Sequence, residues 1–217
     1  MTCCNQYCAA EKQFDLKKAE SDLQRYRRRG PDAVTRLMLA ELRRWPLQGE
    51  ALLDVGSGIG IIGAELANSG LASATLVDAS PAYLDVARAE IESRYESRPI
   101  RFLLGDFATI ADTVTDADVV TLNRVVCCYP DADALLRGAA SRTRQVLAFS
   151  YPRDRWYMWI MTAFENFWRR LKGSTFRTFV HPPERMGAVL EAAGLVRVAR
   201  QGTLVWVLDL YRRKETV

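Results

Sequence analysis

The chain is organised around one stretch, Ala51-Leu52-Leu53-Asp54-Val55-Gly56-Ser57-Gly58-Ile59-Gly60. Its apolar part, residues 51–55, is too short for a helix and does not alternate with polar residues, which is typical of a central parallel strand buried on both faces. The glycines that follow allow a sharp turn and let the backbone approach a ligand closely. The stretch therefore predicts a buried strand, a ligand-binding turn and a helix, in that order.

Two classes of cofactor use such a turn. Residues 58–63 satisfy the pattern G-x-G-x-x-G, which binds a dinucleotide pyrophosphate at a helix N-terminus. Asp54 argues against a pyrophosphate, because a fixed carboxylate so near would repel it. Residues 53–60 resemble the first motif of the Rossmann-like, or class I, methyltransferases that use S-adenosyl-L-methionine (SAM), whose amino end is cationic. This resemblance implies an α/β fold with SAM as the cofactor.

Apolar strands and amphipathic helices alternate along the rest of the chain. Further strands are predicted at 74–77, 100–104, 117–122, 145–150, 196–198 and 204–211, and helices at 81–97, 131–141 and 184–193. The resemblance implies that these elements form a three-layer, doubly wound α/β fold with a seven-stranded, mostly parallel sheet whose last strand is antiparallel. Residues 46–217 are expected to form this SAM-dependent methyltransferase domain.

Residues 1–45 are expected to form an N-terminal helical extension. Apolar residues recur at helical spacing from residue 11 to residue 45, and Gly30-Pro31 predicts a break between two helices. In the methyltransferases that the chain resembles, such helices form a lid over the cofactor, which would bring Tyr26 and Arg29 to the site. The arginines at positions 25 and 27–29 are typical of a solvated helix end, and they also suit an RNA backbone.

Acids at the ends of the next two strands complete the expected cofactor site. Asp78 follows the second strand, where a carboxylate can accept both ribose hydroxyls; it can also cap the following helix, but Ser80 can take that role. The resemblance implies that Asp106 binds the adenine amino group and that Phe107 packs on the ring. The residues expected to bind SAM are Asp54, Gly56, Ser57, Gly58, Gly60, Asp78, Ala79, Asp106, Phe107, Asn123 and Arg124.

The loop after the fourth strand, residues 123–130, should face the methyl donor, because ligands of open α/β sheets bind beyond the carboxyl ends of the strands. It lacks the Asn-Pro-Pro-Tyr or Asp-Pro-Pro-Tyr sequence with which amino-methyltransferases of DNA and RNA bind their target nitrogen, so nucleic acid is not the expected partner. Candidates for a catalytic role are Cys128, Tyr129 and the single histidine, His181. A thiol here can also be a small buried apolar group.

The segment from Tyr151 to Arg170 is unusually aromatic. Apolar residues cover most of the circumference of the predicted helix, a wider face than docking on a sheet needs. Four interpretations stay open: core packing, a hydrophobic wall of the substrate site, an oligomer contact, and a helix that lies on a membrane surface. Basic residues near both ends suit the last of these; they are Arg153, Arg155, Arg169, Arg170 and Lys172.

The composition is that of an ordinary globular protein, with 49% hydrophobic residues, 26% charged residues and a net charge of +4. The sequence lacks the features of a signal peptide and has no apolar run long enough to cross a membrane, which predicts a cytoplasmic protein without a transmembrane segment. Cysteines at 3, 4, 8, 127 and 128 are odd in number and clustered, which predicts reduced thiols. No resident metal is predicted, although together these thiols could hold a thiophilic metal or metalloid.

Short pieces of the chain also resemble the magnesium-protoporphyrin IX methyltransferases. The pieces are residues 117–130, the strand end at 149–152 before the aromatic segment, and His181-Pro182. That family has a histidine just before the Tyr-Pro pair, and it is implicated in the chemistry, whereas this chain has Cys128. The substrate is therefore left open by the resemblance.

The expected activity is transfer of a methyl group from SAM to an O, N or S atom of a hydrophobic small molecule by in-line displacement. Such a displacement depends on alignment of the reactants more than on acids and bases. The alternatives are methylation of a thiol-bound metalloid or of RNA, and a non-catalytic SAM-fold protein that binds a partner through the aromatic segment. The sequence does not predict an oligomeric state.

Overall fold

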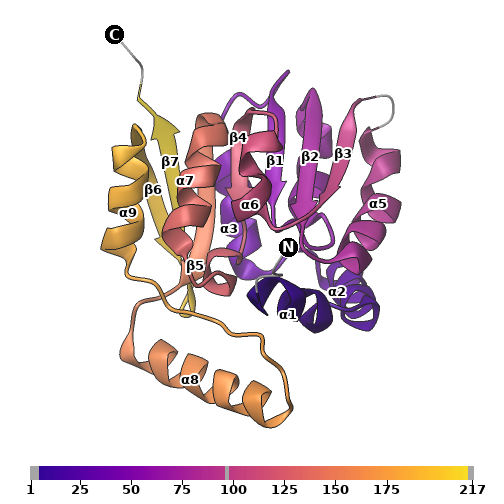
Figure 1. Cartoon of the computed structure of the whole chain (residues 1–217). Coiled ribbons are helices and arrows are strands. Elements are labelled where there is room, and N and C mark those ends of the chain that lie inside the picture. The colour runs from indigo at the N-terminus through magenta and orange to yellow at the C-terminus, as the bar shows by residue number, and fades with distance from the viewer. Residues whose placement is uncertain (1–4, 96–97, 215–217) are drawn as a thin grey trace.

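The computed structural model describes residues 5–95 and 98–214. Within them one sheet is formed by β1 (Ala51–Val55), β2 (Ser73–Asp78), β3 (Ile100–Leu104), β4 (Ala117–Leu122), β5 (Thr143–Pro152), β6 (Leu195–Gly202) and β7 (Trp206–Arg213). The strand order is β3-β2-β1-β4-β5-β7-β6, and β7 lies antiparallel between β5 and β6 while β1 to β5 are parallel. The predicted doubly wound sheet with an antiparallel last strand is confirmed (Figure 1).

Helices cover both faces of the sheet and make three layers (Figure 1). One face packs against α3 (Ala33–Leu42), α4 (Ile61–Leu66) and α5 (Pro81–Tyr95), and the other against α6 (Phe107–Ile110), α7 (Ala132–Arg142) and α9 (Pro183–Ala192). Short 3₁₀ turns occupy 67–69, 111–113 and 126–128. This arrangement is the one that alternating strands and helices predict.

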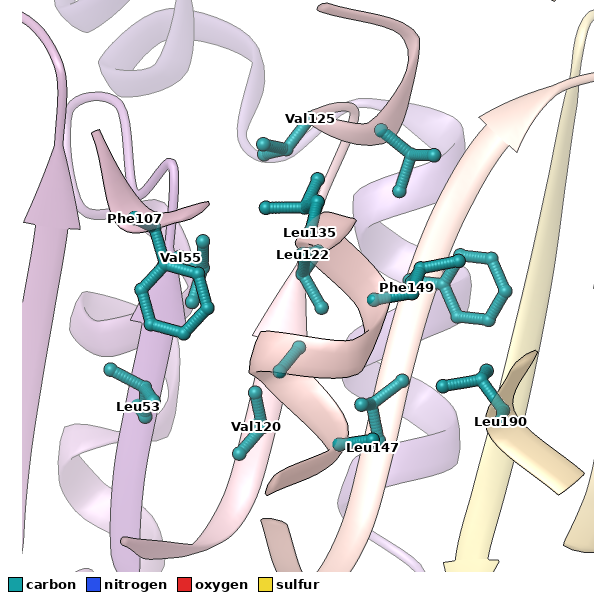
Figure 2. Close-up of a cluster of buried hydrophobic side chains, with 14 of the residues drawn as sticks. Leu53, Val55, Phe107, Val120, Leu122, Val125, Leu135, Leu147, Phe149 and Leu190 are labelled. Carbon is teal, nitrogen blue, oxygen red and sulfur yellow. The ribbon is translucent and has the colours of Figure 1, made fainter. Parts of the chain in front are cut away.

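The side chains of β1 show how one strand joins two cores. Leu53 and Val55 pack into the cluster beneath α6, α7 and α9, whereas Leu52 points to the opposite face and packs with α3, α4 and α5. Figure 2 shows the first cluster, in which Phe107 lies beside Leu53 and Val55. Because Leu53 is fully buried, truncating it to alanine would cost about 2–5 kcal/mol. Burial on both faces explains why the strand has no polar alternation.

Two N-terminal helices, α1 (Asn5–Gln13) and α2 (Leu16–Arg29), lie at the carboxyl ends of the parallel strands (Figure 1). They are held there by the Ser80 hydroxyl, which donates to the Phe14 carbonyl over 2.6 Å, and by the Tyr83 hydroxyl, which donates to Asp22 over 2.6 Å. The predicted break at residues 30–31 is confirmed, since α2 ends at Arg29 and α3 begins after Asp32. α1 was not predicted, because it carries few apolar residues.

The division of the chain near residue 45 stays a prediction. α3, on the N-terminal side of that division, packs into the same core as β1 through Val34, Met38, Leu39 and Leu42. Its N-cap, Asp32, accepts hydrogen bonds from the Thr35 backbone and hydroxyl over 2.9 and 2.8 Å. α3 is thus a core helix of the sheet, while α1 and α2 lie over its carboxyl edge.

The aromatic segment forms α8 (Trp156–Leu171), which lies apart from the layers at the carboxyl edge of the sheet (Figure 1). Met158 is the buried residue of this helix, and most of its large apolar side chains are exposed. Core packing therefore does not account for the segment. None of the described helices is long and apolar enough to cross a membrane.

The cysteines are partly at variance with the sequence prediction. Cys127 and Cys128 are free thiols, as predicted, but Cys8 is disulfide-bonded, which corrects the prediction of reduced thiols for this residue. An odd count of cysteines argues against a disulfide framework, but it does not exclude a single disulfide bond. Cys3 and Cys4, which the metal-binding alternative also needs, lie outside the described residues.

Candidate functional site

A cavity of about 880 Å³ lies at the carboxyl edge of the sheet. Its walls come from α1, α2, the glycine turn after β1, the ends of β2 and β3, the loop after β4, one side of α8, residues 176–179 and residues 205–206. The site therefore lies where open α/β sheets bind their ligands, beyond the carboxyl ends of the strands and at the point where the strand order reverses.

The backbone of the glycine turn favours glycine at positions 56, 58 and 60. Gly56, Gly58 and Gly60 have φ angles of +63°, +56° and +75°, a region that other residues rarely adopt. A Cβ at Gly56 would also overlap the Val125 side chain from the loop after β4. The turn thus brings bare backbone to the cavity, as its sequence predicts.

Two buried polar atoms beside the turn have no hydrogen-bond partner among the described residues. They are Oδ2 of Asp54 and the hydroxyl of Ser57. The other carboxylate oxygen of Asp54 accepts a 2.7 Å hydrogen bond from Thr121, and burial raises the pKa of Asp54 to about 7. Since unpartnered buried polar atoms are costly, this pair indicates a place where a polar ligand completes the structure.

Asp78, at the end of β2, forms a hydrogen bond that stabilises the glycine turn. One carboxylate oxygen accepts a 2.8 Å hydrogen bond from the Gly58 N–H, and the other accepts one of 2.8 Å from the Ser80 N–H. Burial raises the pKa of Asp78. Ser80 caps α5, because its hydroxyl accepts from the Tyr83 N–H over 3.3 Å. A carboxylate has about four acceptor positions, so Asp78 keeps capacity for a ligand hydroxyl, and Ala79 beside it lines the cavity.

Asp106 and Phe107 end up in different environments. Asp106 caps α6 by accepting from the Ala108 N–H over 3.1 Å and also accepts from the Tyr129 hydroxyl over 2.9 Å. Phe107 borders the cavity, but its side chain is 1% exposed and belongs to the core cluster of Figure 2. The Phe107 ring therefore packs in the core beneath the cavity.

Asn123 and Arg124 tie the loop after β4 to its neighbours. The Asn123 side chain donates to the Thr35 hydroxyl over 2.8 Å and accepts from the Ser150 hydroxyl over 2.8 Å. Arg124 has a φ of +64° and its guanidinium donates to Asp32 over 2.8 Å. Both residues line the cavity, but these contacts make them part of its frame.

Arg124 is also the one residue other than glycine, among those described, with a φ in the left-handed region. Its N–H donates to the Ser150 hydroxyl over 2.8 Å, and its guanidinium lies 5.0 Å from the centre of the Trp206 ring. Such strain persists only where the surroundings hold it. Thr35, Ser150 and Trp206 carry no motif, so sequence reasoning missed them.

The candidate catalytic residues do not all reach the cavity. Cys128 and Tyr129 line it, and Sγ of Cys127 lies 4.0 Å from Sγ of Cys128. His181 is not among the lining residues; its Nε2 lies 2.9 Å from the Tyr129 carbonyl oxygen, and burial lowers its pKa. The structure therefore places His181 behind the loop that carries Cys128 and Tyr129.

The N-terminal helices form a wall of the cavity. Tyr26 and Arg29 line it, in agreement with their expected place, and the Tyr26 hydroxyl donates to Glu65 over 2.9 Å. Gln6 of α1 donates to the carbonyls of Cys128 and Arg177 over 2.8 and 2.7 Å, which joins α1 to the loop after β4 and to the segment after α8. Gln6 has no sequence signal that could have identified it.

The part of the cavity wall that comes from α8 and the segments beside it, which we call the apolar end, carries a group of large apolar side chains together with Thr162, Glu165 and Arg169. The apolar side chains come from α8, the segment after it and the first residue of β7, and they are Met158, Met161, Phe176, Phe179 and Trp206. They are far apart in the sequence and share no motif. Sequence reasoning offered only a hydrophobic substrate wall in the aromatic segment as one of several alternatives.

Comparisons with protein families and with solved structures identify proteins that this chain resembles. Residues 52–147 match the protein family described as methyltransferase domain. Magnesium protoporphyrin IX methyltransferase from Synechocystis PCC 6803, solved with bound SAM, is similar over 99% of this chain and 100% of its own, with a TM-score of 0.70 and 16% identity. No curated protein sequence matches the chain significantly.

Two further solved structures share the fold. An O-methyltransferase family protein from Burkholderia thailandensis has a TM-score of 0.70 and 18% identity over 94% of this chain and 62% of its own. The putative methyltransferase solved in complex with the Haloferax volcanii Trm112 activator has a TM-score of 0.70 and 16% identity over 96% and 99% of the two chains. Residues 52–147 therefore carry a methyltransferase domain, on the fold that these solved structures share.

Proposed function

We propose that the enzyme methylates an O, N or S atom of a hydrophobic small molecule. The observation that carries this proposal is the apolar end of the cavity, where Met158, Phe179 and Trp206 continue the space that begins at the glycine turn. The volume of about 880 Å³ lies near the upper end of the range for single-ligand pockets. We infer that it holds the cofactor and an acceptor together.

The residues of the polar end suit SAM. We propose that Asp54 and Ser57 receive its amino acid part through their unpartnered oxygens, that Asp78 accepts its ribose hydroxyls, and that Asp106 binds its adenine. The backbone of residues 56–60 would lie against the nucleoside, since glycine leaves no Cβ there. Ala79, Asn123 and Arg124 complete the wall.

When bound, SAM would supply a methyl carbon on a sulfonium: the acceptor's electron pair would form a bond to that carbon in line, while the C–S bond breaks and the neutral thioether leaves. The carboxylate that α8 brings to the cavity, Glu165, is paired with Arg169 over 3.1 Å. A hydrogen bond to Cys127, together with burial, raises the pKa of the Cys128 thiol, and burial raises the pKa of the Tyr129 phenol, so both stay protonated near neutrality. We infer that the protein acts mainly by aligning the acceptor and excluding water.

Cys128 and Tyr129 then act as wall residues that position the acceptor. The Tyr129 hydroxyl donates to Asp106, which links the acceptor side of the cavity to the adenine side. His181 would act through Tyr129, by holding the carbonyl of its loop, and not by contact with the acceptor.

RNA methylation has less support. The arginines of α2 that suit a phosphate backbone are partly engaged within the protein: Arg25 pairs with Asp22 over 3.0 Å, and Arg27 pairs with Glu90 over 2.8 Å. These contacts favour the interpretation of a solvated helix end. The pair of Arg27 with Glu90 also holds α2 against α5.

The test is a transfer assay with methyl-labelled SAM and a panel of apolar acceptors bearing a carboxylate, phenol, amine or thiol. Trp206→Ala should raise the KM for an accepted apolar compound about tenfold, because a large buried contact is lost. SAM affinity by titration calorimetry should not change. If no acceptor is methylated while a structured RNA is, or if SAM does not bind at all, the proposal is wrong.

A further inference from the structure

α8 carries an apolar stripe on the face that is turned away from the protein. Trp156 is 74% exposed and Phe164 is 65% exposed. The other exposed members recur with them every three or four residues, which puts them on one side of the helix, and they are Ile160, Phe167 and Leu171. Trp159, Met161 and Trp168 widen the exposed apolar surface at its flanks.

The opposite face of the same helix contacts the protein through the buried Met158 and through polar residues. Thr162, Glu165 and Arg169 border the cavity. The Asn166 side chain donates to the Thr178 carbonyl over 2.8 Å, and Arg169 donates to the Thr178 hydroxyl over 3.0 Å. Most of the large apolar side chains of α8 thus face outward, whereas those of a helix docked on a core face inward. An apolar stripe of this size on the outside indicates an external apolar medium or partner.

The tip of the β6–β7 hairpin extends the stripe. Leu204 is strongly exposed there, and the Tyr157 hydroxyl at the start of α8 donates to the Leu204 carbonyl over 2.7 Å. Arg153 holds the same tip by donating to the Thr203 carbonyl over 2.6 Å. The stripe and the tip therefore form one surface, which we call the α8 surface: Trp156, Ile160, Phe164, Phe167, Leu171 and Leu204.

Cations flank the α8 surface at both ends. Arg155 precedes the helix, and Arg170 and Lys172 close it; all three are exposed, and none forms an ion pair within the described part of the chain. The two acids of this region are already engaged, Asp154 with the Trp159 indole N–H over 2.8 Å and Glu165 with Arg169 over 3.1 Å. The surface is apolar at its centre and positive at its rim.

We propose that the α8 surface docks on the face of an anionic lipid bilayer. A helix of 16 residues is about 24 Å long, too short to cross the hydrocarbon core of about 30 Å but suited to lie in the plane of its interface. Tryptophan and phenylalanine can enter the boundary of the acyl chains while the three cations reach phosphate headgroups.

A second copy of the chain fits the same surface less well. An antiparallel pairing of two α8 stripes would bring Arg155 of one copy to Arg170 and Lys172 of the other, and a parallel pairing would bring like ends together. Both arrangements place cations against cations without an acid between them, which is unfavourable. Anionic headgroups neutralise the same rim.

The experiment is flotation of the full chain with two kinds of vesicle, phosphatidylcholine alone and phosphatidylcholine mixed with phosphatidylglycerol. We expect about tenfold or more tighter binding to the anionic vesicles. Phe164→Glu should weaken that binding about tenfold. Val198→Glu is the matched control, because Val198 is a 46% exposed apolar residue on the edge strand β6, and it should leave binding unchanged.

Exchange of Arg155, Arg170 and Lys172 for glutamate should abolish the preference for anionic vesicles and leave the fold intact by circular dichroism. If Phe164→Glu proves unfolded, Ile160→Glu serves in its place. Equal binding to both vesicles, or none, overturns the proposal. A lipid-free dimer by light scattering that Phe164→Glu converts to monomer, without vesicle binding, also overturns it and assigns the surface to a second copy.

Discussion

At the glycine end of the cavity, residues 54–60 and Asp78 are joined by short contacts between neighbouring strands, whereas at the apolar end α1, α8 and the β6–β7 turn meet from distant parts of the chain. The first end depends on backbone conformation and tolerates few residue types. The second depends on side-chain volume, which many sequences can supply. This contrast suggests that the cofactor end is rigid and specific and that the apolar end determines which acceptor is used.

The largest effect is expected from a substitution in the glycine turn. Gly56→Ala should lower the free energy of unfolding by about 4 kcal/mol and abolish SAM binding, because the new Cβ meets Val125 and the φ of +63° is strained. Gly49→Ala is the control: its φ is +80° but no atom lies within 4 Å of the new Cβ, so about 1 kcal/mol is expected. Urea unfolding measures both. Equal costs would show that the Val125 side chain moves away from the new Cβ without an energetic penalty.

The next effect concerns the pH dependence of stability. Burial raises the pKa of Asp54 from 3.8 to about 7, so the folded state holds a proton that the unfolded state has already released. The stabilising contribution is present below the unfolded pKa and is lost as pH rises through the folded one. Wild type should therefore lose about 3 kcal/mol relative to Asp54→Asn between about pH 5 and pH 8.

Urea unfolding across this pH range compares the two proteins. A constant difference between wild type and Asp54→Asn would show that Asp54 is ionised in the folded protein throughout, contrary to its burial.

The third effect concerns Asp78, the acid at the end of β2. Asp78→Ala should weaken SAM binding by about 2 kcal/mol, because a charged acceptor for the ribose hydroxyls is lost. Asp118→Ala removes a similar bond at the other end of β1, where Asp118 accepts from the Ala51 N–H over 2.9 Å. It should lower stability and leave SAM affinity unchanged in titration calorimetry. An unaltered affinity in Asp78→Ala would remove Asp78 from the cofactor site.

The smallest effect is expected from a substitution of Tyr129, whose hydroxyl links the two ends of the cavity. Tyr129→Phe should weaken SAM binding by about 1 kcal/mol, because Asp106 loses the 2.9 Å hydrogen bond that helps to orient it. Tyr157→Phe loses a bond of 2.7 Å to the Leu204 carbonyl, far from the cofactor end, and should leave the affinity as it is. Equal affinity of wild type and Tyr129→Phe would show that the two ends act independently.

The α/β fold and the glycine turn could be read from the sequence, because their causes lie within a few neighbouring residues. A buried parallel strand needs a short apolar run, and a turn with three positive φ angles needs glycine. Asp78 could be placed for the same reason, since it directly follows a strand. Its bond to the Gly58 N–H follows from the parallel pairing of β1 with β2.

The surroundings of His181, Phe107 and Cys8 could not be predicted in this way. A proline-flanked histidine has no local sign that its ring lies against the Tyr129 carbonyl, and an aromatic residue after a strand has none that it enters the core. The disulfide at Cys8 is likewise not readable from the count of cysteines. The positions of His181 and Phe107 are outcomes of packing between segments that are remote in sequence.

The sequence by itself determined the order of strands and helices, the glycine turn and the acids beside it, because each follows from local backbone preference and hydrophobic periodicity. Only the tertiary structure decided which side of α8 faces outward, which segments form the apolar end of the cavity, and that α1 is joined to the loop of Cys128. Periodicity shows that a helix has an apolar face, but the direction of that face depends on what the rest of the chain leaves to cover it.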